Sequence, residues 1–160
     1  MADLRQALTF NFANASVLMI DASPISLEVM TNILSGYGFK RMYRCSDLAS
    51  GTDIVKTHAI DLMLIDPDAF GEEGYKLIGW IRSEQRGPNA NVPIIIATAY
   101  TRVKMITTAR QCGADYVVAK PFSTSALLER ILWVASSDGR RGEMLAPEVV
   151  NQSGSGLELW

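Results

Sequence analysis

The segment DLMLID, residues 61–66, decides the fold, because four consecutive apolar residues stand between two aspartates. An apolar run this short and continuous is typical of a β-strand that is buried on both faces. Three further runs have nearly the same character, at residues 17–20, 94–98 and 116–119. A fifth run, RMYRC at residues 41–45, alternates polar and apolar side chains and predicts a strand at the edge of the sheet.

Helical periodicity fills the intervals between these strands. Ser23 is the expected N-cap of the first helix, with Pro24 in its first turn, and Gly36 and Gly38 are expected to end it. The remaining helices are predicted at about residues 47–58, 75–82 and 102–112, and from Ser123 or Thr124 onward. Strand and helix therefore alternate five times. This order predicts an α/β fold, a doubly wound five-stranded parallel sheet with helices on both faces.

Length and composition describe a single globular unit. Of the 160 residues, 48% are hydrophobic and 20% charged, and the net charge is -2. This balance favours a folded domain and provides no basic footprint for nucleic acid or an anionic membrane. Cys45 and Cys112 are isolated cysteines, which suit a reducing compartment, and residues 11–20 are too polar for a signal peptide or a membrane span. We therefore expect a cytoplasmic protein with no nucleic-acid or membrane partner.

The carboxyl ends of the predicted strands carry side chains with reactive chemistry. In parallel α/β sheets the site lies at this edge, near the point where the strand order reverses. Asp21 follows the first strand, Asp66 the third and Lys120 the fifth, while Thr98 ends the fourth strand and Asp68 lies just beyond Asp66. Taken singly, each has an ordinary explanation, such as a helix cap or a surface lysine. Together they could bind Mg²⁺ and a phosphoryl group, and a carboxylate can itself accept phosphoryl as a nucleophile.

These strand ends resemble those of the bacterial two-component response-regulator receiver (CheY-like) family. The matching segments are VLMIDASP (17–24), DLMLID (61–66) with Gly74 eight residues on, IIIATA (94–99), and GAD (113–115) followed by KPF (120–122). The resemblance implies a flavodoxin/CheY-like receiver domain at residues 16–135. Residues 1–15 would form an N-terminal extension, and the Gly- and Ser-containing residues 136–160 a flexible tail.

The resemblance also implies a role for each site residue. Asp66 corresponds to the aspartate that accepts a phosphoryl group from a histidine kinase or histidine phosphotransfer protein. Thr98 and Lys120 correspond to the residues that bind this phosphoryl group and switch the conformation. The expected cofactor is Mg²⁺, held by Asp21, Asp66 and the backbone carbonyl of Asp68.

The chain departs from the family pattern at Ala22, where the family usually has a second acid that ligates the metal. Loss even of an outer-shell partner typically costs roughly 10–100-fold in metal affinity or activity, so we expect weakened Mg²⁺ binding. Asp66 is nevertheless expected to stay ionised without metal. Ala22 reduces the repulsion between like charges, and Lys120 favours the charged form of Asp66.

A second departure concerns the switch aromatic of the family, whose position is occupied by Val117. Tyr116 is one residue away, and a shift of one residue along a strand turns a side chain to the opposite face. The usual coupling between the threonine and a rotating aromatic is therefore in question. Asp68 and Tyr100 fall at positions that border the phosphoryl group in the family.

Two functions are open at this point. The first is a stand-alone response regulator, not an enzyme, that accepts phosphoryl on Asp66 in a phosphorelay. It would signal by binding a downstream protein through its fourth helix, fifth strand and fifth helix. The alternative, suggested by Ala22 and Val117, is a degenerate receiver that acts as a phosphorylation-independent interaction or scaffolding module. The same face, or residues 1–15, could also serve a homodimer, and the sequence names neither the kinase nor the downstream partner.

Overall fold

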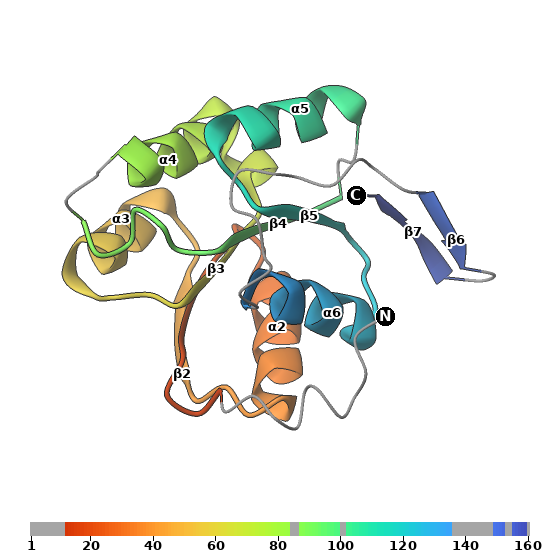
Figure 1. The fold of residues 1–160 in the computed structure, drawn as a ribbon, viewed down its shortest axis with the longest axis horizontal. Helices are drawn as coiled ribbons and strands as arrows, with labels where there is room; N and C mark the ends of the chain where they lie inside the picture. The colour runs from red at the N-terminus through yellow and green to blue at the C-terminus, as the bar shows by residue number, and fades with distance from the viewer. Residues whose placement is uncertain (1–11, 84–86, 100–101, 136–148, 153–154, 160) are drawn as a thin grey trace.

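A five-stranded parallel sheet forms the centre of the computed structural model, which describes residues 12–83, 87–99, 102–135, 149–152 and 155–159. The strand order is β2-β1-β3-β4-β5. The strands are β1 (Ser16–Ile20), β2 (Arg41–Cys45), β3 (Leu62–Ile65), β4 (Ile94–Thr98) and β5 (Tyr116–Ala119). Helices α2 (Pro24–Gly36) and α6 (Thr124–Ala135) cover one face, and α3 (Leu48–Thr57), α4 (Glu72–Ser83) and α5 (Val103–Cys112) cover the other (Figure 1). The predicted doubly wound fold is confirmed.

The predicted buried strands have two apolar faces because their side chains alternate between two separate cores. In β1, Leu18 and Ile20 pack on the side of α3, α4 and α5. Val17 and Met19, the alternate residues, pack on the side of α2 and α6. In contrast, β2 lies at the edge of the sheet and includes exposed side chains, as its alternating sequence predicts.

The helix boundaries agree with the prediction except for those of α4, the helix that precedes β4. The helix α2 begins with Ser23 as its N-cap and Pro24 in its first turn. The helix α4 begins at Glu72, earlier than the predicted residue 75, and follows an unpredicted 3-10 helix, η1 (Pro67–Phe70). Gly74 permits this close arrangement, because a Cβ atom at that position would overlap the backbone of Pro67.

Two further strands, β6 (Val149–Gln152) and β7 (Ser155–Leu159), pair antiparallel within the segment expected to be a tail. They were not predicted, and the flexibility of that segment stays a prediction. The expected N-terminal extension lies mainly outside the described residues.

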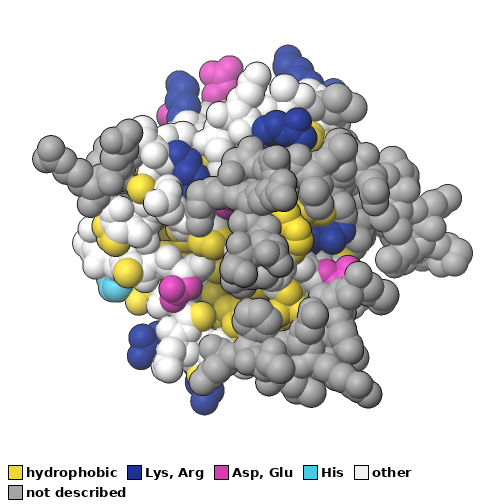
Figure 2. All heavy atoms as spheres, in the orientation of Figure 1, with side chains coloured by type: hydrophobic (Ala, Val, Ile, Leu, Met, Phe, Trp, Pro, Cys, Tyr) yellow, Lys and Arg dark blue, Asp and Glu magenta, His cyan; other side chains and the backbone are white. Residues whose placement is uncertain are grey.

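On the face seen in Figure 2, lysine and arginine side chains are interspersed with acidic ones. Among the described residues, no helix has both the length and the apolar character needed to cross a membrane.

Candidate functional site

The register of the sheet brings the two predicted acids together. Ile20 of β1 pairs with Ile65 of β3, so the next residues, Asp21 and Asp66, emerge side by side. The backbone N–H of Asp66 donates to the carbonyl oxygen of Ile20 at 3.0 Å, which extends the pairing beyond the strand end. The strand order reverses between β1 and β3, so the acids lie where ligand sites of open α/β sheets occur.

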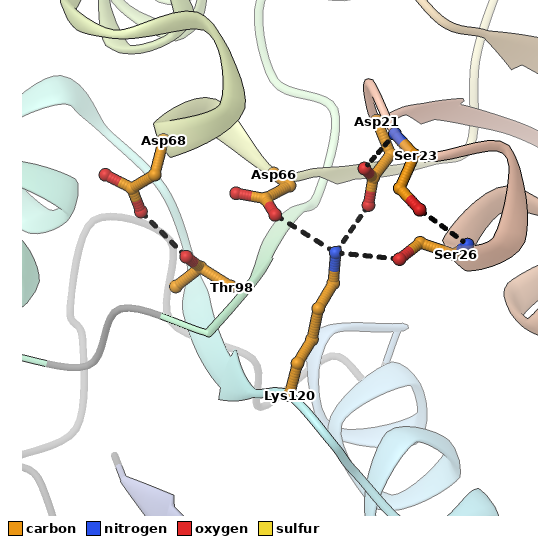
Figure 3. A network of polar contacts seen from close by, with 7 residues as sticks. All are labelled: Asp21, Ser23, Ser26, Asp66, Asp68, Thr98 and Lys120. Carbon is orange, nitrogen blue, oxygen red and sulfur yellow. Dashed lines mark hydrogen bonds and ion pairs between the residues drawn. The ribbon is translucent and has the colours of Figure 1, made fainter.

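The neighbouring strands β4 and β5 position the hydroxyl and the ammonium in the same way. Thr98 pairs with Ala119, and the backbone N–H of Lys120 donates to the carbonyl oxygen of Thr98 at 2.8 Å. The four side chains predicted to meet at this edge are therefore brought together (Figure 3).

Lys120 is the central cation of this group. Its Nζ donates to Asp21 Oδ2 at 2.5 Å, to Asp66 Oδ2 at 3.0 Å and to Ser26 Oγ at 3.3 Å. The Lys120 side chain is 18% exposed, and those of Asp21 and Asp66 are 2% and 14% exposed, so solvent screens these contacts little. Ser26 was not predicted, because nothing in the sequence distinguishes a serine in the first turn of a helix from a surface residue.

The carboxylate oxygens of the two acids differ in their partners. Asp21 Oδ1 accepts a hydrogen bond from the backbone N–H of Ser23 at 2.9 Å, so both oxygens of Asp21 are engaged. Asp66 Oδ1 is buried and has no hydrogen-bond partner among the residues that the structure describes. Leaving a buried acceptor unpaired is unfavourable, so this oxygen is a natural position for a ligand.

Burial raises the pKa of the Asp66 carboxyl above its ordinary value. Lys120 lowers this pKa through its hydrogen bond and charge, whereas the charges of Asp21 and Asp68 raise it. The sequence predicted that Lys120 favours the charged form of Asp66. In the folded protein desolvation has the larger effect on this pKa, and the net shift is upward.

Asp68 turns away from Lys120 and contacts Thr98 (Figure 3). Thr98 Oγ1 donates to Asp68 Oδ2 at 2.7 Å, and the Tyr75 hydroxyl donates to Asp68 Oδ1 at 2.9 Å. Burial and the Asp68 carboxylate raise the pKa of the Tyr75 hydroxyl, so it keeps its proton and acts as a donor. Tyr75 was not predicted as a site residue, because its position depends on the unpredicted helix η1.

The acidic residues fit Mg²⁺ in their donor chemistry. Asp21, Asp66 and the backbone carbonyl of Asp68 supply oxygen donors, which Mg²⁺ prefers, and the buried Asp66 Oδ1 needs a partner. The Asp68 carbonyl accepts a long hydrogen bond from the Gly71 N–H, at 3.4 Å. The Ala22 side chain adds no oxygen, and within the described ranges no group of three or more Asp, Glu, His or Cys side chains is suited to a metal. The two carboxylates and the carbonyl therefore match the donor chemistry of Mg²⁺, and weakened binding stays a prediction.

Val117 occupies the position at which the family has its switch aromatic, and Tyr116 precedes it. The two side chains point to opposite faces of the sheet, as predicted. Val117 packs in the core beneath α3, α4 and α5, whereas Tyr116 packs on the opposite face of the sheet with α2 and α6. Tyr100, the other residue expected near the phosphoryl group, lies outside the described residues.

Comparison with known proteins identifies residues 17–132 as a match to the family model described as response regulator receiver domain. The chain is 24% identical to the chemotaxis protein CheY-3 of Vibrio cholerae, over 74% of this chain and 89% of the relative. It is 33% identical to the transcriptional regulatory protein GltR of Pseudomonas aeruginosa, over 72% of this chain and 47% of the relative. Among solved structures, a response regulator from Thermotoga maritima is 27% identical with a TM-score of 0.68, covering 77% of this chain and 99% of that one.

Proposed function

The chain belongs to the family of response regulator receiver domains, signalling modules of two-component systems, and on this premise we propose that it accepts a phosphoryl group on Asp66. The donor would be a histidine kinase or a histidine phosphotransfer protein. The observation that carries the proposal is the buried Asp66 Oδ1, which has no partner among the described residues while Lys120 holds Oδ2 of the same carboxylate.

In the proposed transfer, Asp66 Oδ1 attacks the phosphorus atom of a phosphohistidine. A new O–P bond forms as the N–P bond breaks, and the electron pair of that bond returns to the imidazole nitrogen. Lys120 holds the acceptor carboxylate and lies close enough to neutralise charge on the incoming oxygens. Mg²⁺, when bound by Asp21, Asp66 and the Asp68 carbonyl, would supply further positive charge for these oxygens.

The signal would leave the domain through the face formed by α5, β5 and α6, which would bind a downstream protein. The proximity of the site to this face supports the proposal, because Thr98 and Lys120 are joined through the backbone hydrogen bond between β4 and β5.

The decisive experiment is intact-mass measurement after incubation with Mg²⁺ and acetyl phosphate, for the wild type and Asp66→Asn. We expect the mass of one phosphoryl group on the wild type alone, and loss of that group in hydroxylamine, which cleaves acyl-phosphates. Absence of an Asp66-dependent adduct, both with acetyl phosphate and with the cognate kinase, would contradict the proposal.

A phosphorylation-independent interaction module is the second candidate. The observation that favours it is that Lys120 already neutralises Asp21 and Asp66 and that Thr98 already donates to Asp68. This candidate predicts that Asp66→Asn leaves the affinity for the downstream partner unchanged. A loss of affinity of about tenfold or more in that variant would exclude it.

A further inference from the structure

The hydroxyl group of Thr98 donates its proton to a carboxylate of the protein itself. Thr98 is fully buried at the end of β4, and its Oγ1 donates to Asp68 Oδ2 at 2.7 Å. The other oxygen of Asp68 accepts a hydrogen bond from the Tyr75 hydroxyl at 2.9 Å. Asp68 therefore joins three elements, β4, η1 and α4, through two hydroxyl donors.

Counting protons shows that this arrangement excludes another. A threonine hydroxyl has one proton to donate, and a carboxylate is an acceptor only. While Thr98 donates to Asp68, it cannot also donate to a phosphoryl oxygen on Asp66. A hydrogen bond to a charged acceptor is stronger than one between neutral groups. The Asp68 carboxylate therefore competes effectively with a phosphoryl oxygen for the Thr98 proton.

The negative charge of Asp68 also opposes the binding of a phosphoryl group at Asp66. The charge of Asp68 raises the pKa of the Asp66 carboxyl, so the two acids interact. A phosphoryl group would add roughly 1.5 to 2 negative charges next to Asp68. An Asp68 carboxylate that remained in place would oppose that charge as well as retain the Thr98 proton.

A cleft of about 340 Å³ between α4 and α5 offers Asp68 a second position. Asp68 and Tyr75 line this cleft together with Arg102 and Lys104, which have exposed side chains at the start of α5. An Asp68 carboxylate released by Thr98 would therefore face cations on the opposite wall. Release of Thr98 would therefore let the Asp68 carboxylate move toward the start of α5.

We propose that Asp68, oriented by Tyr75, is a positioning residue that holds Thr98 away from Asp66 until a phosphoryl group arrives. The name Asp68 clasp is used below for the contacts among Thr98, Asp68 and Tyr75. The clasp lowers the affinity of the site for a phosphoryl group. Val117 lies in the core at the position of the family's switch aromatic, so no aromatic side chain at that position can couple to Thr98. The clasp couples Thr98 to Tyr75 on α4. The phosphoryl part of this inference rests on the proposed function, whereas the resting position of Thr98 does not.

The test compares three variants. Tyr75→Phe removes only the hydroxyl that orients Asp68, and Asp68→Ala removes the acceptor while keeping the backbone carbonyl proposed as a metal ligand. Tyr37→Phe is the matched control, since the Tyr37 hydroxyl donates to the Thr124 carbonyl at 3.1 Å, outside the Asp68 clasp. Two quantities are measured by NMR: the χ1 rotamer of Thr98 without ligand, and the apparent affinity for beryllofluoride with Mg²⁺.

In the wild type and Tyr37→Phe we expect one Thr98 rotamer, and in Asp68→Ala a redistribution of rotamers. We expect Asp68→Ala to bind beryllofluoride roughly tenfold more tightly, as loss of one competing charge-assisted hydrogen bond implies, and Tyr75→Phe to improve binding by a smaller factor. A gain in affinity distinguishes positioning from a structural role, because damage to the fold would weaken binding.

The outcomes separate the two proposals. An unchanged Thr98 rotamer in Asp68→Ala, or unchanged or weaker beryllofluoride binding by that variant, would overturn the clasp. If no form binds beryllofluoride and none is phosphorylated, the proposed function fails, and the Thr98 rotamer alone decides whether the clasp exists.

Discussion

Lys120 controls the charge of the acidic site, because one ammonium group contacts two carboxylates. Its ion pairs with Asp21 and Asp66 join residues on three separate strand ends in a largely buried setting. A metal ion held by Asp21 and Asp66, as proposed, would share these two acids with Lys120. Position 22, next to Asp21, is alanine and contributes no further carboxylate.

Replacing Ala22 by aspartate should strengthen Mg²⁺ binding. A second carboxylate beside Asp21 would add an oxygen ligand and a negative charge, and we expect the dissociation constant to fall by a factor on the order of 10–100. Isothermal titration calorimetry on metal-free protein measures the change. Ala22→Asn is the control of equal size without the charge, and equal affinity of Ala22→Asp and wild type would contradict the expectation.

The elements of this fold differ in how directly their sequences define them. Four strands have the predicted bounds, because short apolar runs have few other ways to be buried. In contrast, the segment between β3 and α4 was only partly predicted. The helix η1 forms where Gly74 lets α4 approach the backbone of Pro67, a contact that no local pattern reveals.

The last turn of α4 is joined to its surroundings by Arg82. Its guanidinium group donates to the carbonyl oxygens of Gly113 and Val92, at 2.9 and 2.6 Å, and forms an ion pair with Asp115 at 2.9 Å. The side chains of Arg82 and Asp115 are 15% and 4% exposed. Asp115 also accepts a hydrogen bond from the backbone N–H of Ile94, at the start of β4.

We therefore expect Arg82→Met to lower the free energy of unfolding by about 3–5 kcal/mol, since it removes the guanidinium group that pairs with the buried Asp115 carboxylate. Urea denaturation followed by circular dichroism measures this change. The control is Lys76→Met on the same helix, which breaks the exposed Lys76–Glu73 pair and should have no measurable effect. Equal effects of the two variants would show that burial of the ion pair is unimportant.

At the scale of the whole molecule, stability should depend on pH through Asp66. Its pKa in the folded protein is raised above the ordinary value of 3.8, so folding disfavours the charged carboxylate. The favourable contribution of protonated Asp66 is complete below pH 3.8 and is lost as the pH rises through the raised folded value.

Asp66→Asn removes this charge and should therefore raise the melting temperature at pH 7. The difference from wild type should shrink as the pH falls toward 3.8. Differential scanning calorimetry across this range tests the expectation, with Asp53→Asn on the exposed side of α3 as a control. A lower melting temperature for Asp66→Asn at pH 7 would mean that its ion pair with Lys120 outweighs desolvation.

From the order of amino acids alone, the sheet, its edge strand β2 and the meeting of Asp21, Asp66, Thr98 and Lys120 can be predicted. The physical reason is that burial of short apolar runs is a local property, and the carboxyl ends of parallel strands share one edge. The opposite orientations of Tyr116 and Val117 follow equally from the period of a strand.

The pairing of these side chains depends on the folded arrangement. Lys120 and Asp21 are 99 residues apart in the chain, and their contact requires the twist and register of four strands, β1, β3, β4 and β5. The upward direction of the Asp66 pKa comes from desolvation, which depends on everything packed around the carboxylate. The contacts of Asp68 with Thr98 and Tyr75 likewise require η1. Hydrogen bonds need distances correct to a few tenths of an ångström, and only packing of the complete domain sets them.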